Sequence, residues 1–404
     1  MTSANPTCDE ALAAILVERS GSVTTPKGFA AAGIAAGIKA SGNPDLALVV
    51  NEGPLFDAAA VFTSNRIFAA PVEWSRGVTS DGVLRAVVLN SGGANACTGK
   101  EGLADSARTA VQVATGLDCA VTDVAVCSTG LIGVRLPMDQ LLSGVDTAVG
   151  QLSPQGGPDA AQAIMTTDTV RKMASFTSPD GWSIGGIAKG AGMLAPALAT
   201  MLVVITTDAE IKPLALDRAL RAASAVSFDR ADSDGCQSTN DSVILLANGA
   251  SAHSPHPDEF TTALAAVCRD LAMQLLADAE GAAHDIAITV KNAATEADAL
   301  EVGRSIARNN LFKCAIFGND PNWGRVLAAA GTTTAAFEPE NLDVWFNGVC
   351  VYRQGAIGED RSLVDLSARA VDVVVDLNHG SHQATIWTND LTYDYVKENA
   401  EYSS

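Results

Sequence analysis

A short stretch in the middle of the chain, residues 189–207, limits most strongly what this sequence can fold into. It begins with the small-residue run KGAGM at residues 189–193, and Pro196 then blocks helix formation. Residues 200–207 (TMLVVITT) are apolar and β-branched, which is typical of a strand buried on both faces. We therefore expect Thr200 at the first position of a buried strand, where its hydroxyl group is held rigidly.

Segments with strand-like and helix-like patterns alternate along the chain, so we expect a mixed α/β (α+β) fold. The expected strands are residues 84–90, 121–127, 182–188, 200–207, 286–290, 343–346 and 371–377. The expected helices are residues 103–115, 137–152, 214–227, 260–278 and 295–309, the last with Thr295 as its N-cap. The pattern changes after about residue 281, so we expect a main domain of residues 1–280 and a C-terminal domain of residues 281–404.

The charge of the chain argues against two classes of partner. Lys and Arg total 26 against 46 Asp and Glu, which gives a formal net charge of −20. Because such a field repels phosphate backbones and anionic lipids, we expect neither nucleic acid nor a membrane surface as a partner. Residues 1–20 carry Asp9 and Glu10 and no basic region, so they do not resemble a signal peptide. We expect a cytoplasmic protein.

The cysteines and histidines give no sign of a disulfide framework or a metal site. The eight cysteines are scattered, without a C-x-x-C pair, and are typical of reduced core cysteines. The five histidines form no H-E-x-x-H motif. Four of them stand beside Pro, Ser or Gly and are expected in loops: His253, His256, His379 and His382.

Thr200 admits two interpretations. If the peptide bond before it is cut, its free α-amine, with a pKa of roughly 7.7–8.0, can act as a base on its own hydroxyl. This is how N-terminal threonine enzymes activate a weak nucleophile. The alternative is an ordinary threonine at the start of a strand that follows a Gly-rich turn.

Two other glycine-containing segments, residues 190–195 and 128–130, can also be interpreted either as functional sites or as ordinary turns. Gly190, Gly192 and Ala195 fit a relaxed dinucleotide-binding fingerprint, which requires a helix directly after the turn. Pro196 and the following strand leave no room for that helix, so we reject this interpretation. Residues 128–130 (STG) follow a predicted strand, and a turn there can stabilise an oxyanion or can simply connect a strand to a helix.

The stretch from Lys189 to Leu202 strongly resembles the signature of the ornithine acetyltransferases, also called glutamate N-acetyltransferases, of arginine biosynthesis. Further matching segments follow in order along nearly the whole chain, at residues 26–29, 61–63, 70–72, 90–92, 97–99, 128–130, 165–169, 238–241, 317–325, 391–396 and 399–402. The resemblance implies a layered α-β-β-α sandwich of an N-terminal-nucleophile enzyme, with a smaller C-terminal α/β domain.

The resemblance also implies an activity. The chain would cut itself between Ala199 and Thr200, and the two chains would stay together, as a heterotetramer of two α and two β chains. Thr200 would take the acetyl group from N2-acetylornithine, release ornithine and pass the group to glutamate, which gives N-acetylglutamate. Some members of the family also use acetyl-CoA as the donor. No metal or bound cofactor is required.

Site residues are carried over position by position. Thr129 and Gly130 resemble the oxyanion hole, and the substrate-binding set comprises Thr166, Lys189, Thr200, Glu280, Asn399 and Ser404. Glu280 can pair with the δ-amine of ornithine and Lys189 with its α-carboxylate.

The chain departs from the family pattern at a few positions. Ala283 and His284 stand where Thr and Lys are usual after Glu280, Gly93 stands where Asn is usual, and Ser404 stands where Thr is common. Cys236-Gln237 replaces a more typical acidic and hydroxyl pair. Two alternative functions stay open. One is a related N-terminal-nucleophile aminopeptidase or amidohydrolase with water as the acceptor, and the other is a non-catalytic α/β protein that binds a metabolite.

Overall fold

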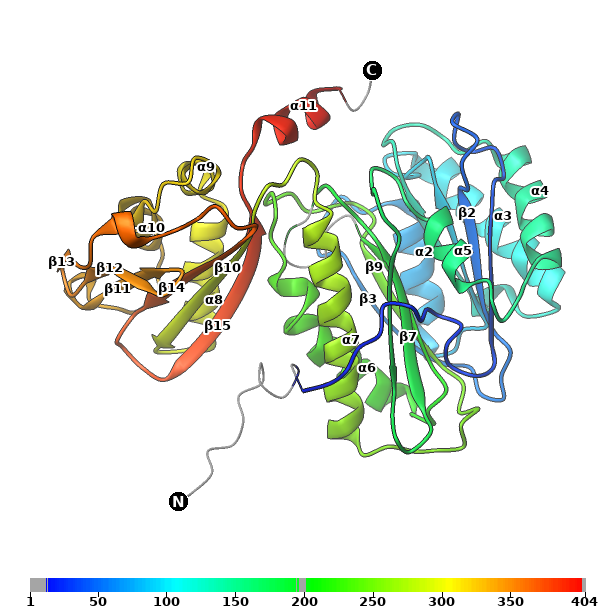
Figure 1. Cartoon of the computed structure of the whole chain (residues 1–404). Coiled ribbons are helices and arrows are strands. Elements are labelled where there is room, and N and C mark those ends of the chain that lie inside the picture. Colours follow the sequence, from blue (N-terminus) through cyan, green and yellow to red (C-terminus); the bar gives the residue numbers. More distant parts are fainter. Residues whose placement is uncertain (1–11, 13, 194, 196–200, 402–404) are drawn as a thin grey trace. The chain divides into compact units, whose positions relative to one another are not determined.

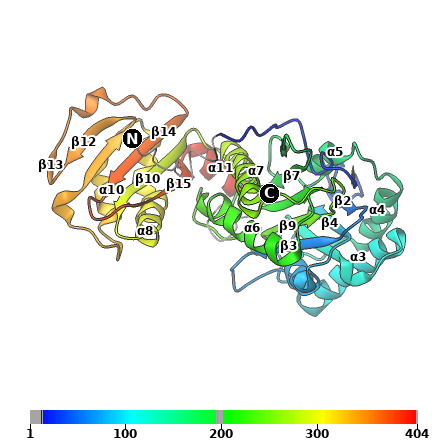
Figure 2. The ribbon, with the colours of Figure 1, turned by 90° about the horizontal axis from the view of Figure 1, so that it is seen from below.

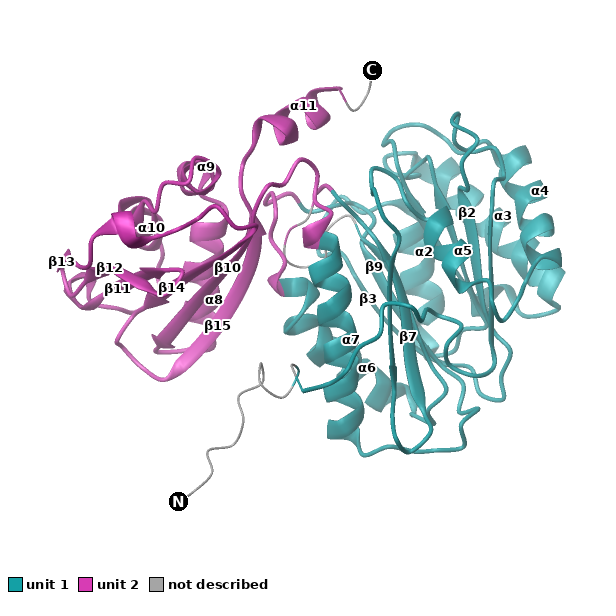
Figure 3. Ribbon diagram, viewed as in Figure 1, with its two compact units in different colours: residues 1–191, 197–229, 237–275 teal, residues 192–196, 230–236, 276–404 magenta. Residues whose placement is uncertain are grey.

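The computed structural model describes residues 12, 14–193, 195 and 201–401. Its internal contacts divide the chain into two compact units (Figure 3). Unit 1 comprises residues 1–191, 197–229 and 237–275, and unit 2 comprises residues 192–196, 230–236 and 276–404. Two short segments from the middle of the chain therefore belong with its C-terminal part. The expected division into folding domains after residue 280 stays a prediction.

Unit 1 contains two β-sheets. The four-stranded sheet has the order β1 (Phe29–Ile34), β2 (Leu46–Asn51), β4 (Ala86–Ser91) and β5 (Val124–Thr129). The five-stranded sheet has the order β3 (Asp57–Phe62), β9 (Ser242–Ala247), β8 (Leu202–Thr207), β7 (Ser183–Lys189) and β6 (Lys172–Thr177). The helices of this unit are α2 (Ala70–Val78), α3 (Gly99–Leu117), α4 (Met138–Gly150), α5 (Gly157–Ala163), α6 (Pro213–Ala225) and α7 (Pro257–Ala277).

Alternate side chains of the strands build three apolar layers in unit 1. Leu89 on β4 points into the core between the two sheets, which it shares with Val204 on β8. The neighbouring Val88 faces the opposite side of its sheet, where α3 and α4 lie. Likewise Val203 and Ile205 face α6 and α7. The order of layers is thus helix, sheet, sheet, helix (Figures 1 and 2), which confirms the predicted α-β-β-α sandwich and mixed α/β class.

The strand register brings one end of β7 and the start of β8 and β9 to the same edge of the sheet. β7 and β8 are antiparallel, with Lys189 opposite Leu202. β8 and β9 are parallel, with Leu202 opposite Ser242. Met201 and Asp241 directly precede these two strands and therefore lie at the edge where Lys189 ends β7.

Unit 2 is built on one six-stranded sheet. Its order is β13 (Ala356–Ile357), β12 (Val349–Arg353), β11 (Asp343–Phe346), β14 (Ala370–Asp376), β10 (Asp285–Ala293) and β15 (His382–Asn389). Its helices are α8 (Glu296–Ala307), α9 (Asn310–Phe317), α10 (Trp323–Ala330) and α11 (Tyr393–Glu401). Ile288 and Val373 of the sheet form one core with Val302 of α8 and Phe312 of α9. This arrangement agrees with the expected smaller α/β part.

Most expected elements are present, with three informative differences. The apolar pattern of the predicted strand 121–127 ends at Cys127, but β5 continues through Ser128 and Thr129, so these two residues are strand residues and not turn residues. His382 is the first residue of β15 and not part of a loop. The seven cysteines that the structure describes are free, but Cys97, Cys236 and Cys314 are exposed, so the prediction of core positions is wrong for these three.

Helix α7 is long and apolar enough to cross a membrane by length and composition alone. In the structure, its Phe260, Leu264 and Leu271 are buried in the core of unit 1. The apolar character of α7 is therefore explained by its place as a core helix of the sandwich.

The core under α7 depends on one large aromatic side chain. The Trp182 ring is fully buried and its centroid lies 5.5 Å from that of Phe176 and 5.8 Å from that of Phe260. We expect Trp182→Ala to lower the free energy of unfolding by about 3–5 kcal/mol, because it leaves a cavity. Leu214→Ala, at a position of the same unit that is 65% exposed, should change it by less than about 0.5 kcal/mol. Equal effects in denaturant titrations would contradict this account.

Candidate active site

Three of the predicted site residues meet at the end of β7. Lys189 is only 1% exposed, and its Nζ donates hydrogen bonds to Oγ1 of Thr166 (2.7 Å) and Oγ1 of Thr129 (3.2 Å). The same Nζ lies 3.9 Å from Oδ2 of Asp168. A buried ammonium group thus links the end of β5, which carries Thr129, to the segment between α5 and β6, which carries Thr166.

Asp168 supplies the negative charge that this arrangement requires. Its Oδ1 accepts hydrogen bonds from Nζ of Lys172 and from the N–H of Gly190, both at 2.6 Å. Its Oδ2 accepts the N–H of Thr166 at 2.9 Å. Burial alone would raise the pKa of Asp168, but the charges of Lys189 and Lys172 outweigh burial and lower the pKa to about 2. Asp168 is therefore ionised at neutral pH.

The turn after β5 is closely packed against a second glycine-rich turn. Gly130 has a φ angle of 128°, and a Cβ atom there would lie 2.6 Å from the nitrogen of Gly93 and 2.7 Å from the carbonyl carbon of Gly92. The N–H of Gly92 donates to the carbonyl oxygen of Thr129 at 3.0 Å. Only glycine fits at position 130, since any side chain meets backbone atoms.

The buried side chains of Asn90 and Asn240 form hydrogen bonds with Ser128, directly before this turn. The hydroxyl of Ser128 donates to Oδ1 of Asn90 at 2.6 Å. Nδ2 of Asn240 donates to the carbonyl oxygens of Ser128 (2.8 Å) and Ala94 (2.7 Å). A turn fixed in this way presents its backbone and the Thr129 hydroxyl in one geometry, which suits the stabilisation of a developing negative charge.

Ala199 and Thr200 lie outside the described residues. The residue that follows them, Met201, is buried and donates its backbone N–H to Oδ1 of Asp241 at 3.0 Å. Strand β8 begins at Leu202. The predicted strand is thus confirmed for residues 202–207, and the predicted place of Thr200 at its head stays a prediction.

The other predicted residues belong to unit 2. Nδ2 of Asn399 donates to Oε2 of Glu280 at 3.0 Å. A Cβ atom on Gly192 would lie 2.6 Å from the same oxygen, so the glycine-rich segment approaches the Glu280 carboxylate closely. The next residue, Met193, donates its N–H to Oδ2 of Asp234 at 2.7 Å. Ser404 lies outside the described residues.

These geometries can be compared with known proteins. The model of the ArgJ family matches residues 30–404 of the chain. The chain belongs to the ArgJ family. The resemblance found in the sequence is thereby confirmed.

Two relatives show how close the similarity within the ArgJ family is. The arginine biosynthesis bifunctional protein ArgJ of Streptomyces avermitilis is 64% identical over 383 residues, which cover 95% of this chain and 100% of the relative. The protein of the same name from Mycobacterium tuberculosis is 55% identical over 395 residues, which cover 96% of this chain and 97% of the relative. The crystal structure of ornithine acetyltransferase complexed with ornithine from Mycobacterium tuberculosis is 55% identical, with a TM-score of 0.45, and the match covers 46% of this chain and 99% of that chain.

A small cavity in unit 2 of this ArgJ family member contains Glu280. Its volume is about 80 Å³, and its charged lining residues include Asp234, Arg308 and Lys313. Burial raises the pKa of Asp234, although the N–H groups of Cys236 and Met193 offset part of this effect. Burial lowers the pKa of Lys313, whose Nζ donates to the carbonyl oxygen of Ser233. A cavity with both charge signs suits the charged end of an amino acid.

The positions that depart from the family pattern after Glu280 have well-defined partners. The backbone N–H groups of Ala283 and His284 both donate to Oδ1 of Asp390, at 3.0 and 2.9 Å. The His284 ring is buried, with Nδ1 2.7 Å from Oδ2 of Asp390 and Nε2 3.1 Å from the carbonyl oxygen of Leu366. Both ring nitrogens of His284 are thus occupied within unit 2.

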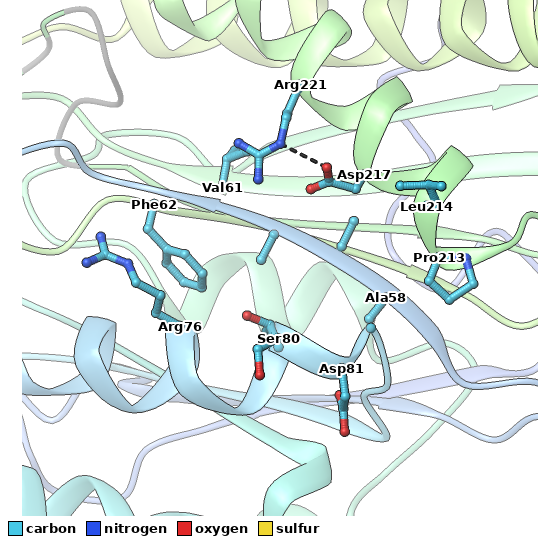
Figure 4. A pocket seen from close by; sticks show the side chains of 14 residues that line it. Ala58, Val61, Phe62, Arg76, Ser80, Asp81, Pro213, Leu214, Asp217 and Arg221 are labelled. Atoms are coloured by element: carbon cyan, nitrogen blue, oxygen red, sulfur yellow. Dashed lines mark hydrogen bonds and ion pairs between the residues drawn. The ribbon is translucent and has the colours of Figure 1, made fainter.

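A much larger cavity in unit 1 contains none of the described site residues. It has a volume of about 550 Å³ and lies along β3, between the end of α2 and the start of α6 (Figure 4). Asp217 and Arg221 of α6 pair across 2.9 Å at its rim. The size of a cavity therefore does not identify the candidate active site. The buried Lys189 and Asp168 and the closely packed turn at Gly130 do not line this cavity.

Sequence reasoning missed Asp168, Lys172 and Asp241 as parts of the site. Asp168 and Asp241 lie in segments that match the family, but the sequence assigns them no role. Lys172 is completely buried at the start of β6, and no local pattern marks a lysine there as a core residue. The signal that identifies all three is the burial of an ionisable side chain, which only the structure gives.

Asp168 generates a stability prediction. We expect Asp168→Asn to lower the free energy of unfolding at pH 7 by about 3–5 kcal/mol, because two buried lysines lose their countercharge. The pKa of Asp168 is lowered from 3.8 to about 2, so its stabilisation is complete above pH 4 and is lost as the pH falls toward 2. The difference between wild type and variant should therefore shrink over that range.

The control is Asp217→Asn, which breaks the exposed pair with Arg221 and should cost about 1 kcal/mol or less. Denaturant titrations between pH 2 and pH 8 measure both effects. An Asp168→Asn variant no less stable than Asp217→Asn would contradict the assigned role.

Proposed function

We propose that this chain is an acetyltransferase that moves the acetyl group from N2-acetylornithine to glutamate through an acetyl-Thr200 intermediate. The enzyme becomes active by cutting itself between Ala199 and Thr200. The observation that carries the proposal is the buried contact of Lys189 with Thr129 and Thr166. It lies at the sheet edge where β8 begins, in a chain that belongs to the ArgJ family.

The proposed chemistry uses groups of the chain itself. The free α-amine of Thr200 takes the proton of its own hydroxyl, and Oγ1 attacks the acetyl carbonyl carbon. Negative charge develops on the carbonyl oxygen, where Thr129 and Gly130 act as the oxyanion hole. The bond to the ornithine nitrogen breaks, and that nitrogen receives the proton. The amine of glutamate then attacks the acetyl ester, which releases N-acetylglutamate and restores the Thr200 hydroxyl.

Substrate recognition follows from charge. We expect Lys189 to pair with an α-carboxylate and Glu280 with the δ-ammonium group of ornithine. Thr166, Asn399 and Ser404 complete the proposed binding set. The hydrogen bond between Asn399 and Glu280 supports this assignment, because it orients the carboxylate.

The proposal also covers the acetyl donor, the assembly of the cleaved chains and the location of the enzyme. The relatives are named bifunctional proteins, and we propose acetyl-CoA as a second acetyl donor to glutamate. The cleaved α and β chains stay together and form a heterotetramer of two α and two β chains. The enzyme acts in the cytoplasm.

The main alternative is an N-terminal-nucleophile aminopeptidase or amidohydrolase, in which water takes the place of glutamate. The Lys189 and Glu280 side chains favour a charged amino acid as the acceptor. A non-catalytic protein that binds a metabolite would need neither a cut chain nor a braced turn at Gly130.

Self-cleavage gives the first test. The intact mass of purified wild-type protein should show two fragments, residues 1–199 and 200–404. Thr200→Ala should remain one uncut chain and lose at least about a thousandfold in activity, because the nucleophile is gone. Thr206→Ala, a matched change further along β8, should still be cut. An intact and fully active wild-type chain would contradict the mechanism.

The acceptor gives the second test. Wild-type enzyme with N2-acetylornithine and glutamate should produce equal amounts of ornithine and N-acetylglutamate, measured by mass spectrometry. Without glutamate, ornithine should appear only as a burst of about one equivalent per active site, because the acetyl group stays on Thr200. Steady release of acetate in the presence of glutamate, without N-acetylglutamate, would favour the hydrolase instead.

A further inference from the structure

One fully buried carboxyl group has no part in the chemistry described above. Asp241 is 0% exposed and directly precedes β9. Its Oδ1 accepts the backbone N–H of Met201 at 3.0 Å. Its Oδ2 is buried and has no hydrogen-bond partner among residues 12, 14–193, 195 and 201–401. A buried carboxyl oxygen without a partner is costly, so its retention calls for a reason.

The backbone around Asp241 is fixed on two sides. The N–H of Thr63 donates to the carbonyl oxygen of Asp241 at 3.0 Å, and the N–H of Ser242 donates to the carbonyl oxygen of Met201 at 3.1 Å. The Thr63 hydroxyl is already committed, because it donates to the carbonyl oxygen of Ser238 at 2.8 Å. The Asp241 side chain is therefore a rigid acceptor for Met201.

Covalent geometry extends this constraint to the neighbouring residue. The nitrogen of Met201 belongs to the planar peptide group that also contains the carbonyl carbon of Thr200. Only that carbon and one Cα atom separate the Met201 nitrogen from the Thr200 nitrogen. A hydrogen bond that holds the Met201 N–H therefore restricts the chain directly after the proposed scissile bond.

We propose that Asp241 is a positioning residue for self-cleavage, which holds the peptide group between Thr200 and Met201 in place through Oδ1. This inference rests on the proposed function. In the cleavage, Oγ1 of Thr200 attacks the carbonyl carbon of Ala199, the bond from that carbon to the Thr200 nitrogen breaks, and the nitrogen gains the hydroxyl proton. Water then hydrolyses the ester. Asp241 forms and breaks no covalent bond.

The surroundings of Asp241 favour the uncharged form of its carboxyl group. Burial raises the pKa of Asp241 well above its usual value, and the bond from Met201 and the charge of Lys189 offset this only in part. A neutral acid carries its proton on Oδ2, since Oδ1 accepts a hydrogen bond. The uncharged form still accepts the Met201 N–H through Oδ1, so the proposed positioning needs no negative charge.

Cell-free synthesis provides an uncut chain whose cleavage can be followed on a denaturing gel. We expect Asp241→Ala to slow the appearance of the two fragments at least about tenfold, because the loss of positioning has large kinetic effects. Asp241→Asn keeps an acceptor for Met201 and is neutral at every pH. It should cut at least about fivefold faster than Asp241→Ala.

The matched control is Asp208→Ala, at the other end of β8. Asp208 is also buried and accepts a backbone N–H, that of Ser183, at 2.7 Å. Its loss should lower the melting temperature but leave the cleavage rate within about twofold of wild type. If Asp241→Ala does not fold, Asp241→Ser replaces it with the same expected values.

Cleavage of Asp241→Ala at the wild-type rate would overturn the inference. So would Asp241→Asn as slow as Asp241→Ala, because that result would require a negative charge at this position. A wild-type chain that stays in one piece would instead contradict the proposed function, and the inference with it.

Discussion

The arrangement of the candidate site in unit 1 depends on one buried carboxylate, which provides the countercharge for two buried lysines. Asp168 lies between Lys172 and Lys189, and the two lysines are 0% and 1% exposed. Moving an ammonium group out of water costs several kcal/mol, and an opposite charge in good geometry offsets that cost. With Asp168 ionised, Lys189 can stay charged in the core and hold the Thr129 and Thr166 hydroxyls in place. The site chemistry therefore depends on an acid that takes no direct part in it.

The local features of the fold could be predicted because neighbouring residues determine them. The apolar run at residues 202–207 forms β8, and Thr295 caps α8 with a complete capping box that involves Asp298. Each of these features needs only a few consecutive residues. The same holds for the rejection of a dinucleotide-binding turn, which needs only Pro196 and the apolar run that follows it.

The contacts that build the candidate site could not be predicted in this way, because they join distant positions. Lys189 and Thr129 are 60 residues apart in the chain. The polar end of β5 was missed because it is fixed by a partner strand, in which Ser91 lies opposite Thr129. The family resemblance indicated the residues that contact substrate in related enzymes, but not Asp168 or Asp241, which act through other residues.

The order of strands in the five-stranded sheet has a consequence for a chain cut after Ala199. β3, β6 and β7 precede that position, whereas β8 and β9 follow it and lie between β3 and β7. The five-stranded sheet would therefore combine strands of both products, with β9 and β8 of the second product inserted between β3 and β7 of the first. In this sheet β3 is separated from β7 and β6 by β9 and β8, so the two products could separate only if β8 and β9 left the sheet. In a chain cut after Ala199, the backbone hydrogen bonds of β8 with β7 and of β9 with β3 would hold the two products together.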